Sequence, residues 1–149
     1  MSKVTASAER EIDAPATDVY GYLLDQHAHQ NFLPPAFSDF HVEEGGVGAG
    51  TVTRFKVTAG GRTRQYRMQV SEPEPGRKLV ETDTDSSLVT TFTVDPKGEK
   101  SLVNITTNWD GAGGIGGFFE KTFAPRAMHR LYLDELERLN TYAVQQRST

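Results

Sequence analysis

The sequence contains no cysteine, which excludes disulfide scaffolds, thiol nucleophiles and thiolate metal sites. It has no run near the roughly 18 apolar residues of a membrane-spanning helix, and residues 1–9 lack the apolar stretch of a signal peptide. Basic side chains number 16 against 20 acidic ones, a net charge of −4, which argues against nucleic acid or an anionic membrane as partner. We therefore expect a soluble cytoplasmic protein that neither binds nucleic acid nor inserts stably into a membrane.

What the sequence does contain is an ordinary globular composition. Of its 149 residues, 36% are hydrophobic and 24% are charged, within the usual range for one folded domain. A chain of this length removes roughly 70% of its unfolded surface from water on folding, so its core needs no metal or disulfide. No repeat, linker or low-complexity segment divides the chain. We expect a single domain over residues 1–149.

Residues 3–35 predict a strand and two short helices. Over 3–13, small or apolar residues alternate with polar ones, the pattern of a half-buried strand. Pro15 ends this strand because proline cannot donate to a strand ladder. Val19, Tyr20 and Leu23 then recur at helical spacing. A second short helical piece over 27–32 precedes two prolines, which end it.

From residue 37 to residue 110 the apolar period changes to two, which predicts β-structure. Six runs of alternating residues occupy 37–44, 51–58, 62–71, 78–84, 88–95 and 102–110. Short breaks rich in glycine, proline, aspartate and serine separate them. Since short turns join neighbouring antiparallel strands, we expect an antiparallel meander. The N-terminal strand brings the expected sheet to seven strands.

The last part of the chain predicts one long amphipathic helix. Its apolar stripe, at three- and four-residue spacing, comprises Phe118, Thr122, Pro125, His129, Tyr132, Leu136, Leu139 and Ala143. The elements together define an α+β domain in which this helix covers one face of a curved sheet. Seven strands are much wider than one helix of about 10–12 Å. We therefore expect an internal cavity between the sheet and the helix.

Several local patterns resemble one known superfamily. They lie at 12–15 (Ile-Asp-Ala-Pro), 19–25, 32–34, 46–50 (Gly-Val-Gly-Ala-Gly), 70–73 and 136–139. With the order of elements, they resemble the helix-grip, START-related (SRPBCC) superfamily, which includes START lipid-transfer domains, birch-pollen-allergen proteins and bacterial polyketide cyclase/dehydrase proteins, and in particular the last branch. The resemblance implies a helix-grip fold: a seven-stranded antiparallel sheet curved around a long C-terminal helix, with two short helices after the first strand. It also implies a hydrophobic pocket between sheet and helix.

Two glycine clusters and three histidines do not indicate a cofactor or a metal. Residues 111–116 match Gly-x-Gly-x-x-Gly, but no strand follows the next helix, as a dinucleotide site requires. Residues 45–50 lack the Lys-Ser/Thr of a phosphate loop and predict a hairpin turn. His27 and His29 point to different sides of a helix, and no acidic residue at suitable spacing completes a metal site. We expect these two and His41 to be exposed.

The period of two also predicts which side chains face the cavity. Arg64, Tyr66 and Met68 share one side of a strand, with Arg64 at the mouth. If they point inward, Arg10 and either Glu81 or Asp83 form a polar patch or ion pair there. A small-molecule site needs an apolar lining with a few polar groups. The predicted ligand-binding residues are Phe32, Phe55, Arg64, Tyr66, Met68, Phe92, Thr107, Trp109, His129 and Tyr132.

These residues leave two functions open. The favoured one is the binding or transport of a small hydrophobic molecule, such as a lipid, a polyketide or a similar aromatic metabolite. The alternative is an enzyme resembling the polyketide aromatase/cyclases or dehydratases, in which His129, Tyr66 and Arg64 position the substrate and move protons. His129 has two interpretations: its ring lies in the cavity, or it is a structural histidine in the core or at the helix margin.

Overall fold

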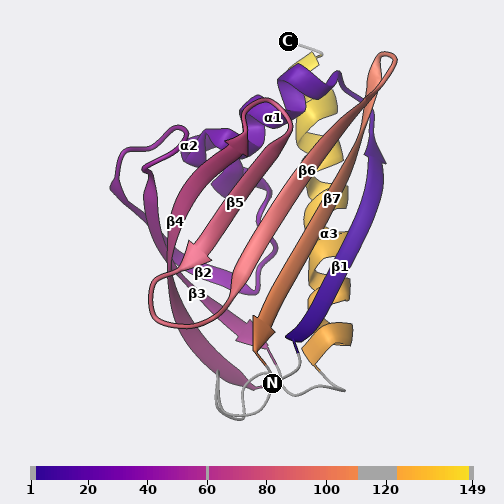
Figure 1. The fold of residues 1–149 in the computed structure, drawn as a ribbon. Coiled ribbons are helices and arrows are strands. Elements are labelled where there is room, and N and C mark those ends of the chain that lie inside the picture. The colour runs from indigo at the N-terminus through magenta and orange to yellow at the C-terminus, as the bar shows by residue number, and fades with distance from the viewer. Residues whose placement is uncertain (1–2, 60, 111–123, 148–149) are drawn as a thin grey trace.

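The computed structural model describes residues 3–59, 61–110 and 124–147. Within them lie one seven-stranded sheet, three α-helices and one 3-10 helix, arranged as Figure 1 shows. In chain order the elements are β1 (Lys3–Ile12), α1 (Ala16–Leu24), α2 (Gln26–His29), η1 (Gln30–Phe32), β2 (Phe37–Glu44), β3 (Val52–Ala59), β4 (Arg62–Glu74), β5 (Lys78–Asp83), β6 (Val89–Lys97), β7 (Lys100–Asp110) and α3 (Ala124–Arg147).

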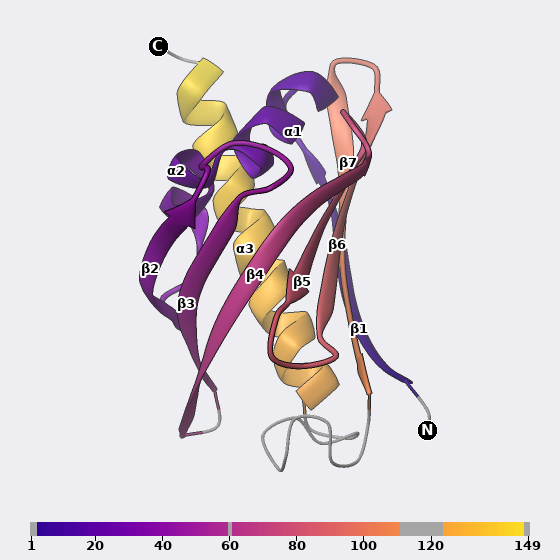
Figure 2. The same ribbon diagram turned by 60° about the vertical axis from the view of Figure 1, so that its left-hand side comes forward.

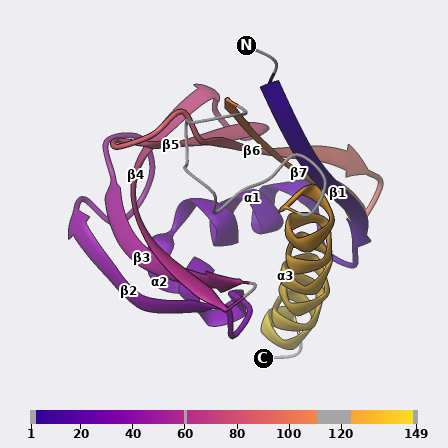
Figure 3. The same cartoon turned by 90° about the horizontal axis from the view of Figure 1, so that it is seen from below.

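The sheet is antiparallel throughout, in the order β1-β7-β6-β5-β4-β3-β2. Strands β2 to β7 follow one another as a meander, and β1 joins β7 at one edge. The sheet curves around α3, which runs along its inner side (Figures 2 and 3). The predicted α+β helix-grip fold, with seven antiparallel strands and two short helices after the first, is therefore confirmed.

Strand β4 differs most from its predicted bounds, because it continues past residue 71 to Glu74. The extension contains Pro73, which cannot donate a backbone hydrogen bond. The pairing with β5 is irregular there: Ser71 faces Val80 and Glu74 faces Lys78, with a register shift between the two pairs. A bulge tolerates proline inside a strand because the ladder is already interrupted.

Alternate residues of the strands fill the space between the sheet and α3. In β7, Val103, Ile105, Thr107 and Trp109 are buried while the residues between them are half-buried, as the period of two predicts. The same alternation holds in β1, β4, β5 and β6 and over most of β3, whereas β2 has no buried residue. Their buried apolar residues include Val4, Ala6, Phe55, Val57, Tyr66, Met68, Val70, Leu79, Phe92 and Val94.

Helices α1 and α2 cross one end of this space, near the C-terminal end of α3 (Figure 1). Asp25 separates them and caps α2, because its Oδ1 accepts a hydrogen bond from the His27 backbone N–H at 2.9 Å. The β2–β3 loop is fixed to this junction by the Gln26 N–H, which donates to the Gly46 carbonyl at 2.9 Å. Gly45 in that loop has φ of 69°, and an added Cβ would lie 2.9 Å from Oγ1 of Thr51. The loop therefore requires glycine at this position.

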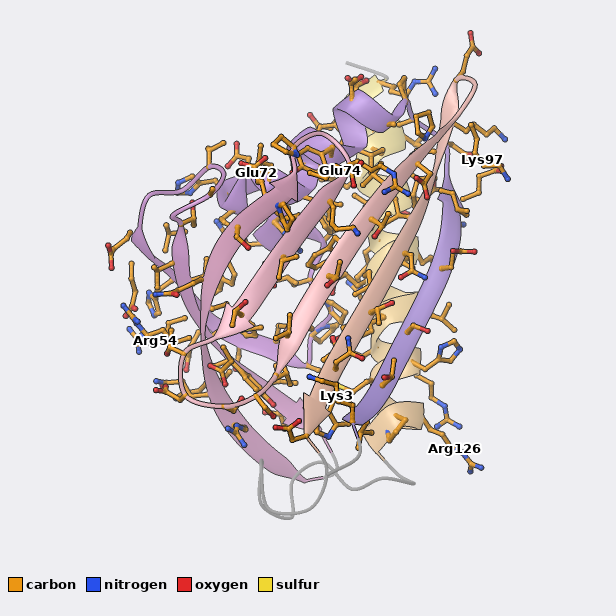
Figure 4. All side chains as sticks on the ribbon, viewed as in Figure 1. Lys3, Arg54, Glu72, Glu74, Lys97 and Arg126 are labelled. Atoms are coloured by element: carbon orange, nitrogen blue, oxygen red, sulfur yellow. The ribbon has the colours of Figure 1, made fainter. Side chains whose placement is uncertain are left out.

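The outer face of the sheet is charged. Arg54 on β3 and Lys97 at the end of β6 project away from the protein in Figure 4. Nε of Arg54 lies 3.0 Å from Oε2 of Glu43, and Nε of Arg67 lies 2.8 Å from Oε1 of the same carboxylate. Exposed pairs of this kind contribute at most about 1 kcal/mol each. The fold therefore depends on its buried inner face.

Strand β2 forms the other edge of the sheet and is irregular. Its pairing with β3 shifts between Ser38 and His41 and again between Val42 and Glu44. Asp39, inside the first shift, has φ of 50°, a left-handed conformation that is costly for a residue with a side chain. These irregularities bend β2 relative to β3.

Helix α3 packs an apolar stripe against the sheet. Its buried residues include Met128, Tyr132, Leu136, Leu139 and Ala143. The predicted stripe members Phe118 and Thr122, and the glycine cluster at 111–117, lie outside the described residues. In the parts of the chain that the structure describes, no helix is long and apolar enough to cross a membrane.

Leu136 provides a test of this packing. It is fully buried on the inner side of α3, whereas Leu133, three residues earlier, is 40% exposed. We expect Leu136→Ala to lower the free energy of unfolding by about 2–5 kcal/mol, because it leaves a cavity in the core. Urea denaturation followed by circular dichroism measures the change. The matched variant Leu133→Ala should change it by about 0.5 kcal/mol or less; equal losses in both would contradict the assigned helix phase.

Candidate functional site

A cavity of about 50 Å³ lies between the inner face of the sheet and helices α2 and α3. A void needs roughly 10–15 Å³ to hold a water molecule, so this one is large enough for several. Most of its lining is apolar and aromatic. The lining residues are Gln26, His29, Leu33, Phe37, Phe40, Phe55, Val57, Tyr66, Met68, Glu81, Leu88, Thr90, Phe92, Met128, Tyr132 and Glu135.

The mouth of the cavity lies between η1 and β2. Leu33, Phe37 and Phe40 are the lining residues that are only half-buried, and every other lining residue is buried. Leu33 directly follows η1, and the two phenylalanines belong to β2. Access to the cavity therefore passes between a short helix and the irregular edge strand.

Aromatic rings form one wall of the cavity. The Phe55 ring centroid lies 5.4 Å from that of Phe37, 6.1 Å from that of Phe40 and 5.9 Å from that of Tyr66. These separations are typical of favourable ring packing. The Arg64 guanidinium lies over the Tyr66 ring, 5.4 Å from its centroid, outside the lining of the cavity.

His29 is the centre of a buried polar group inside the cavity. Its Nδ1 lies 3.0 Å from the Leu23 carbonyl oxygen, and its Nε2 lies 3.1 Å from Oε2 of Glu135 on α3. The Phe32 ring stacks on the imidazole at 4.9 Å, and the Phe92 ring meets it edge-on at 5.4 Å. The side chain therefore has a fixed orientation and joins α2 to α3.

The two contacts of His29 determine its protonation. A carbonyl oxygen can only accept, so Nδ1 carries a hydrogen and donates to Leu23. Nε2 then faces a carboxylate, and a second hydrogen there makes an imidazolium paired with Glu135. Burial by itself lowers the pKa of His29, but the hydrogen bond and charge of Glu135 outweigh it and leave this pKa raised. The pair is therefore ionic over a wider pH range than an isolated histidine would allow.

Glu81 is a second carboxyl group in the cavity. It lies on β5 opposite Thr90 of β6, is 8% exposed, and accepts no hydrogen bond from the described residues. Burial raises the pKa of Glu81 to about 7, with His29 lowering it and Glu135 raising it to smaller extents. Near neutral pH, Glu81 therefore exchanges between a carboxylic acid and a carboxylate.

Hydroxyl groups continue the polar part of the lining. Oγ1 of Thr90 lies 2.8 Å from Oγ1 of Thr107, which is also hydrogen-bonded to the Tyr132 hydroxyl. Burial raises the pKa of Tyr132, so its phenol stays protonated at neutral pH. This chain of hydroxyls connects β6, β7 and α3 behind the cavity.

The structure brings five of the ten predicted ligand-binding residues to the cavity. They are Phe55, Tyr66, Met68, Phe92 and Tyr132. Three more contact lining residues without lining the cavity: Phe32 stacks on His29, Arg64 lies over Tyr66, and Thr107 is hydrogen-bonded to Tyr132. Trp109 is fully buried near the end of β7 and does not line the cavity.

His129 does not lie in the cavity, so that interpretation of it is wrong. It is exposed, and its Nδ1 donates to the Ser7 carbonyl oxygen at 2.6 Å, which ties α3 to β1. At about 100° per residue, His129 is roughly 60° to one side of Tyr132, and Met128 is roughly 40° to the other. Met128 therefore faces the cavity in its place.

The expected exposure of His29 is also wrong. The segment 27–32 is too short to show a helical period, and this ring is buried by tertiary packing against Phe92 of β6 and Glu135 of α3. Glu81 and Asp83 do point inward, but the expected pairing with Arg10 does not occur in the described chain. Arg10 is half-buried and donates to the Glu11 carbonyl, while Glu81 faces His29.

Sequence reasoning missed Glu135 because it lies on the flank of the helical stripe. It directly precedes Leu136 and is three residues after Tyr132, so a stripe defined by apolar residues omits it. The signal that could have found it is an acidic residue beside two apolar stripe positions. Within the described residues, no group of three or more His, Asp and Glu side chains is arranged to hold a metal ion.

Comparison with known proteins agrees with this architecture. Residues 3–144 match the family described as polyketide cyclase/dehydrase and lipid transport. The chain is 37% identical to the KanY protein, solved by NMR, over 96% of this chain and 99% of that one, with a TM-score of 0.84. No match was found among curated proteins.

Two more distant structures share the fold alone. A START superfamily protein from Mycobacterium smegmatis is 14% identical, with coverage of 95% and 98% and a TM-score of 0.75. The Zhui aromatase/cyclase from Streptomyces sp. R1128 is 17% identical, with coverage of 97% and 96% and a TM-score of 0.73.

A long helix held by a curved sheet, with an apolar cavity between them, defines a domain of the helix-grip class. The chain belongs to the polyketide cyclase/dehydrase and lipid transport family.

The His29–Glu135 pair predicts a pH-dependent loss in Glu135→Gln. A histidine whose folded pKa is raised stabilises the protein fully below its unfolded pKa of about 6.5, and this stabilisation disappears as pH rises through the folded pKa. Without Glu135, burial makes the imidazolium unfavourable. We expect the destabilisation of Glu135→Gln to be greatest near pH 5.5 and to shrink toward pH 8, measured by urea denaturation.

NMR titration of the imidazole should show a lower His29 pKa in the same variant. Glu137→Gln, an equal charge change at an exposed position two residues away, should leave both quantities unchanged. A destabilisation by Glu135→Gln that does not vary with pH would contradict the ionic pair.

Proposed function

We propose that this protein binds a small hydrophobic molecule, aromatic or otherwise apolar, in the cavity between the sheet and α3. The observation that carries the proposal is the lining: buried aliphatic and aromatic side chains with a few polar groups gathered around His29. Ligand pockets are typically mostly apolar, with a few placed polar groups that fix orientation. Membership of a family described by lipid transport and polyketide chemistry supports the same class of ligand.

The apolar lining supplies the affinity. Each 40 Å² of apolar ligand surface removed from water contributes about 1 kcal/mol, before the cost of ordering the ligand is subtracted. A cavity of about 50 Å³ is small for a ring-sized molecule. Entry of such a ligand therefore requires the half-buried side chains at the mouth, Leu33, Phe37 and Phe40, to move apart.

Filling the cavity tests this proposal. Val57 lines the cavity on β3, while Thr58, the next residue, is exposed on the outer face. We expect Val57→Phe to weaken binding of the neutral probe N-phenyl-1-naphthylamine at least about tenfold, because the larger side chain occupies the ligand volume. Probe fluorescence measures binding, and circular dichroism checks that the variant is folded.

Thr58→Phe is the matched control, since it adds the same side chain outside the cavity and should leave binding unchanged. Native mass spectrometry of gently purified protein should also detect a bound apolar molecule in the wild type and less of it in Val57→Phe. Equal probe affinity in all three proteins would overturn the proposal.

A second candidate, an acid–base enzyme acting on the bound molecule, is favoured by one observation. His29, Glu135 and Glu81 place exchangeable protons at a buried apolar site, and Glu81 has a pKa of about 7, matched to neutral pH. The groups for such chemistry are then His29 and Glu81, together with the buried Tyr66, and not the exposed His129.

Enolisation of a ketone separates the two candidates. If the site performs acid–base chemistry, the protein accelerates deuterium exchange at the carbon beside the carbonyl of 2-tetralone, measured by NMR in D₂O. Glu81→Gln should slow that exchange by about a hundredfold, within the usual range for loss of a general acid or base, while the ketone still binds. Exchange no faster than in buffer, with the ketone bound, would leave ligand binding as the function.

A further inference from the structure

The polar part of the cavity accepts hydrogen bonds but offers few to a ligand. Both ring nitrogens of His29 are already used, one by the Leu23 carbonyl and the other by Glu135. No lysine or arginine is among the lining residues of the described chain. An anionic group entering here would meet two carboxyl groups and no available cation.

Glu81 is a buried carboxyl group with no hydrogen-bond partner among the described residues. It is more than nine-tenths buried, lines the cavity, and takes no hydrogen bond from the residues that the structure describes. The charge of His29 is balanced by Glu135 through their hydrogen bond. When Glu81 ionises, the three side chains together therefore carry one uncompensated negative charge in a buried site, which is unfavourable without a cation.

The aromatic wall of the same cavity also favours a cation. Phe37, Phe40 and Phe55 pack together there, and the faces of aromatic rings attract positive charge. Phe37 and Phe40 lie at the mouth, so a ligand passes these rings before it reaches Glu81. The arrangement combines an apolar aromatic surface with a buried carboxyl group.

We propose that the cavity takes an apolar amine, whose ammonium group pairs with the Glu81 carboxylate while its hydrocarbon part lies against the aromatic wall. This inference rests on the proposed function and specifies its ligand class. The ammonium supplies both the missing charge and hydrogen-bond donors. Carboxylate and phosphate ligands are excluded by the same carboxyl groups, so free fatty acids are poor ligands.

Protons take part in this binding. Because the free pKa of Glu81 is about 7, a cation that binds its carboxylate displaces a proton into solvent at or below neutral pH. The affinity for an amine should therefore rise from pH 5.5 to pH 8, by roughly thirtyfold for a group of this pKa.

Other titratable groups also face Glu81, and their ionisation changes the charge of the cavity with pH. They are His29 on α2, Glu135 and Tyr132 on α3, and Asp83 on the same face of β5. Deprotonation of His29 at higher pH makes the site more negative and strengthens the same trend. The contribution of Glu81 must therefore be isolated with a variant.

Three probes of similar size and different charge test the proposal: 4-phenylbutylamine, 4-phenylbutan-1-ol and 4-phenylbutanoate. Two of the chain's three methionines, Met68 and Met128, line the cavity, so their ¹³C-methyl resonances report occupancy of the cavity itself. We expect the amine at pH 8 to bind at least about tenfold more tightly than the alcohol. The butanoate should bind more weakly than either.

Glu81→Gln keeps the shape of the side chain and removes its charge. In this variant the amine should lose at least about tenfold in affinity, the alcohol should change less than about twofold, and the pH dependence should fall below about threefold. The variant should remain folded, because it replaces a desolvated carboxyl group that makes no hydrogen bond in the described chain. Glu99→Gln, at an exposed position in the β6–β7 hairpin, is the matched control and should behave as wild type.

The outcomes separate this inference from the function on which it rests. Equal binding of amine and alcohol, or an amine affinity that Glu81→Gln leaves intact, overturns the amine proposal and leaves hydrophobic ligand binding standing. Preferential binding of the butanoate overturns it as well. If no probe shifts the Met68 and Met128 resonances at any pH, the proposed function fails and the amine inference fails with it.

Discussion

One amphipathic helix has to cover the inner face of a seven-stranded sheet, and most other features follow from that mismatch of width. The stripe from Met128 to Ala143 fills part of the space, and α1, α2 and η1 cover one end of it. Aromatic side chains from β2, β3 and β4 occupy much of the remainder without filling it. The cavity is therefore a result of the architecture, and its chemistry is set by the few polar residues that face it.

Among those polar residues, the His29–Glu135 hydrogen bond organises the others. It joins a four-residue helix to the longest one and orients the imidazole between two aromatic rings. While His29 is protonated, it also neutralises the charge of Glu135, and ionisation of Glu81 then gives the cavity a net negative charge. The His29–Glu135 pair therefore both joins α2 to α3 and helps to set the charge of the cavity.

The fold could be predicted from the sequence because periods of two and of three to four persist over whole elements. The site could be predicted only in part. Phe55, Tyr66 and Met68 follow from strand alternation, whereas His129 was misplaced because the helical stripe is narrow and a one-residue difference in phase exchanges it with Met128. The burial of His29 arises from the packing of α2 on α3, a contact between segments 106 positions apart that no local pattern reports.

The irregular edge strand β2 has a consequence outside the cavity. A straight, regular edge strand presents a row of backbone groups that can pair with the edge of another molecule. The two register shifts of β2 and the left-handed Asp39 interrupt that row. The irregularity at the mouth of the cavity therefore also makes this edge a poor template for pairing with the sheet of another molecule. One strand thus combines an apolar opening with resistance to aggregation.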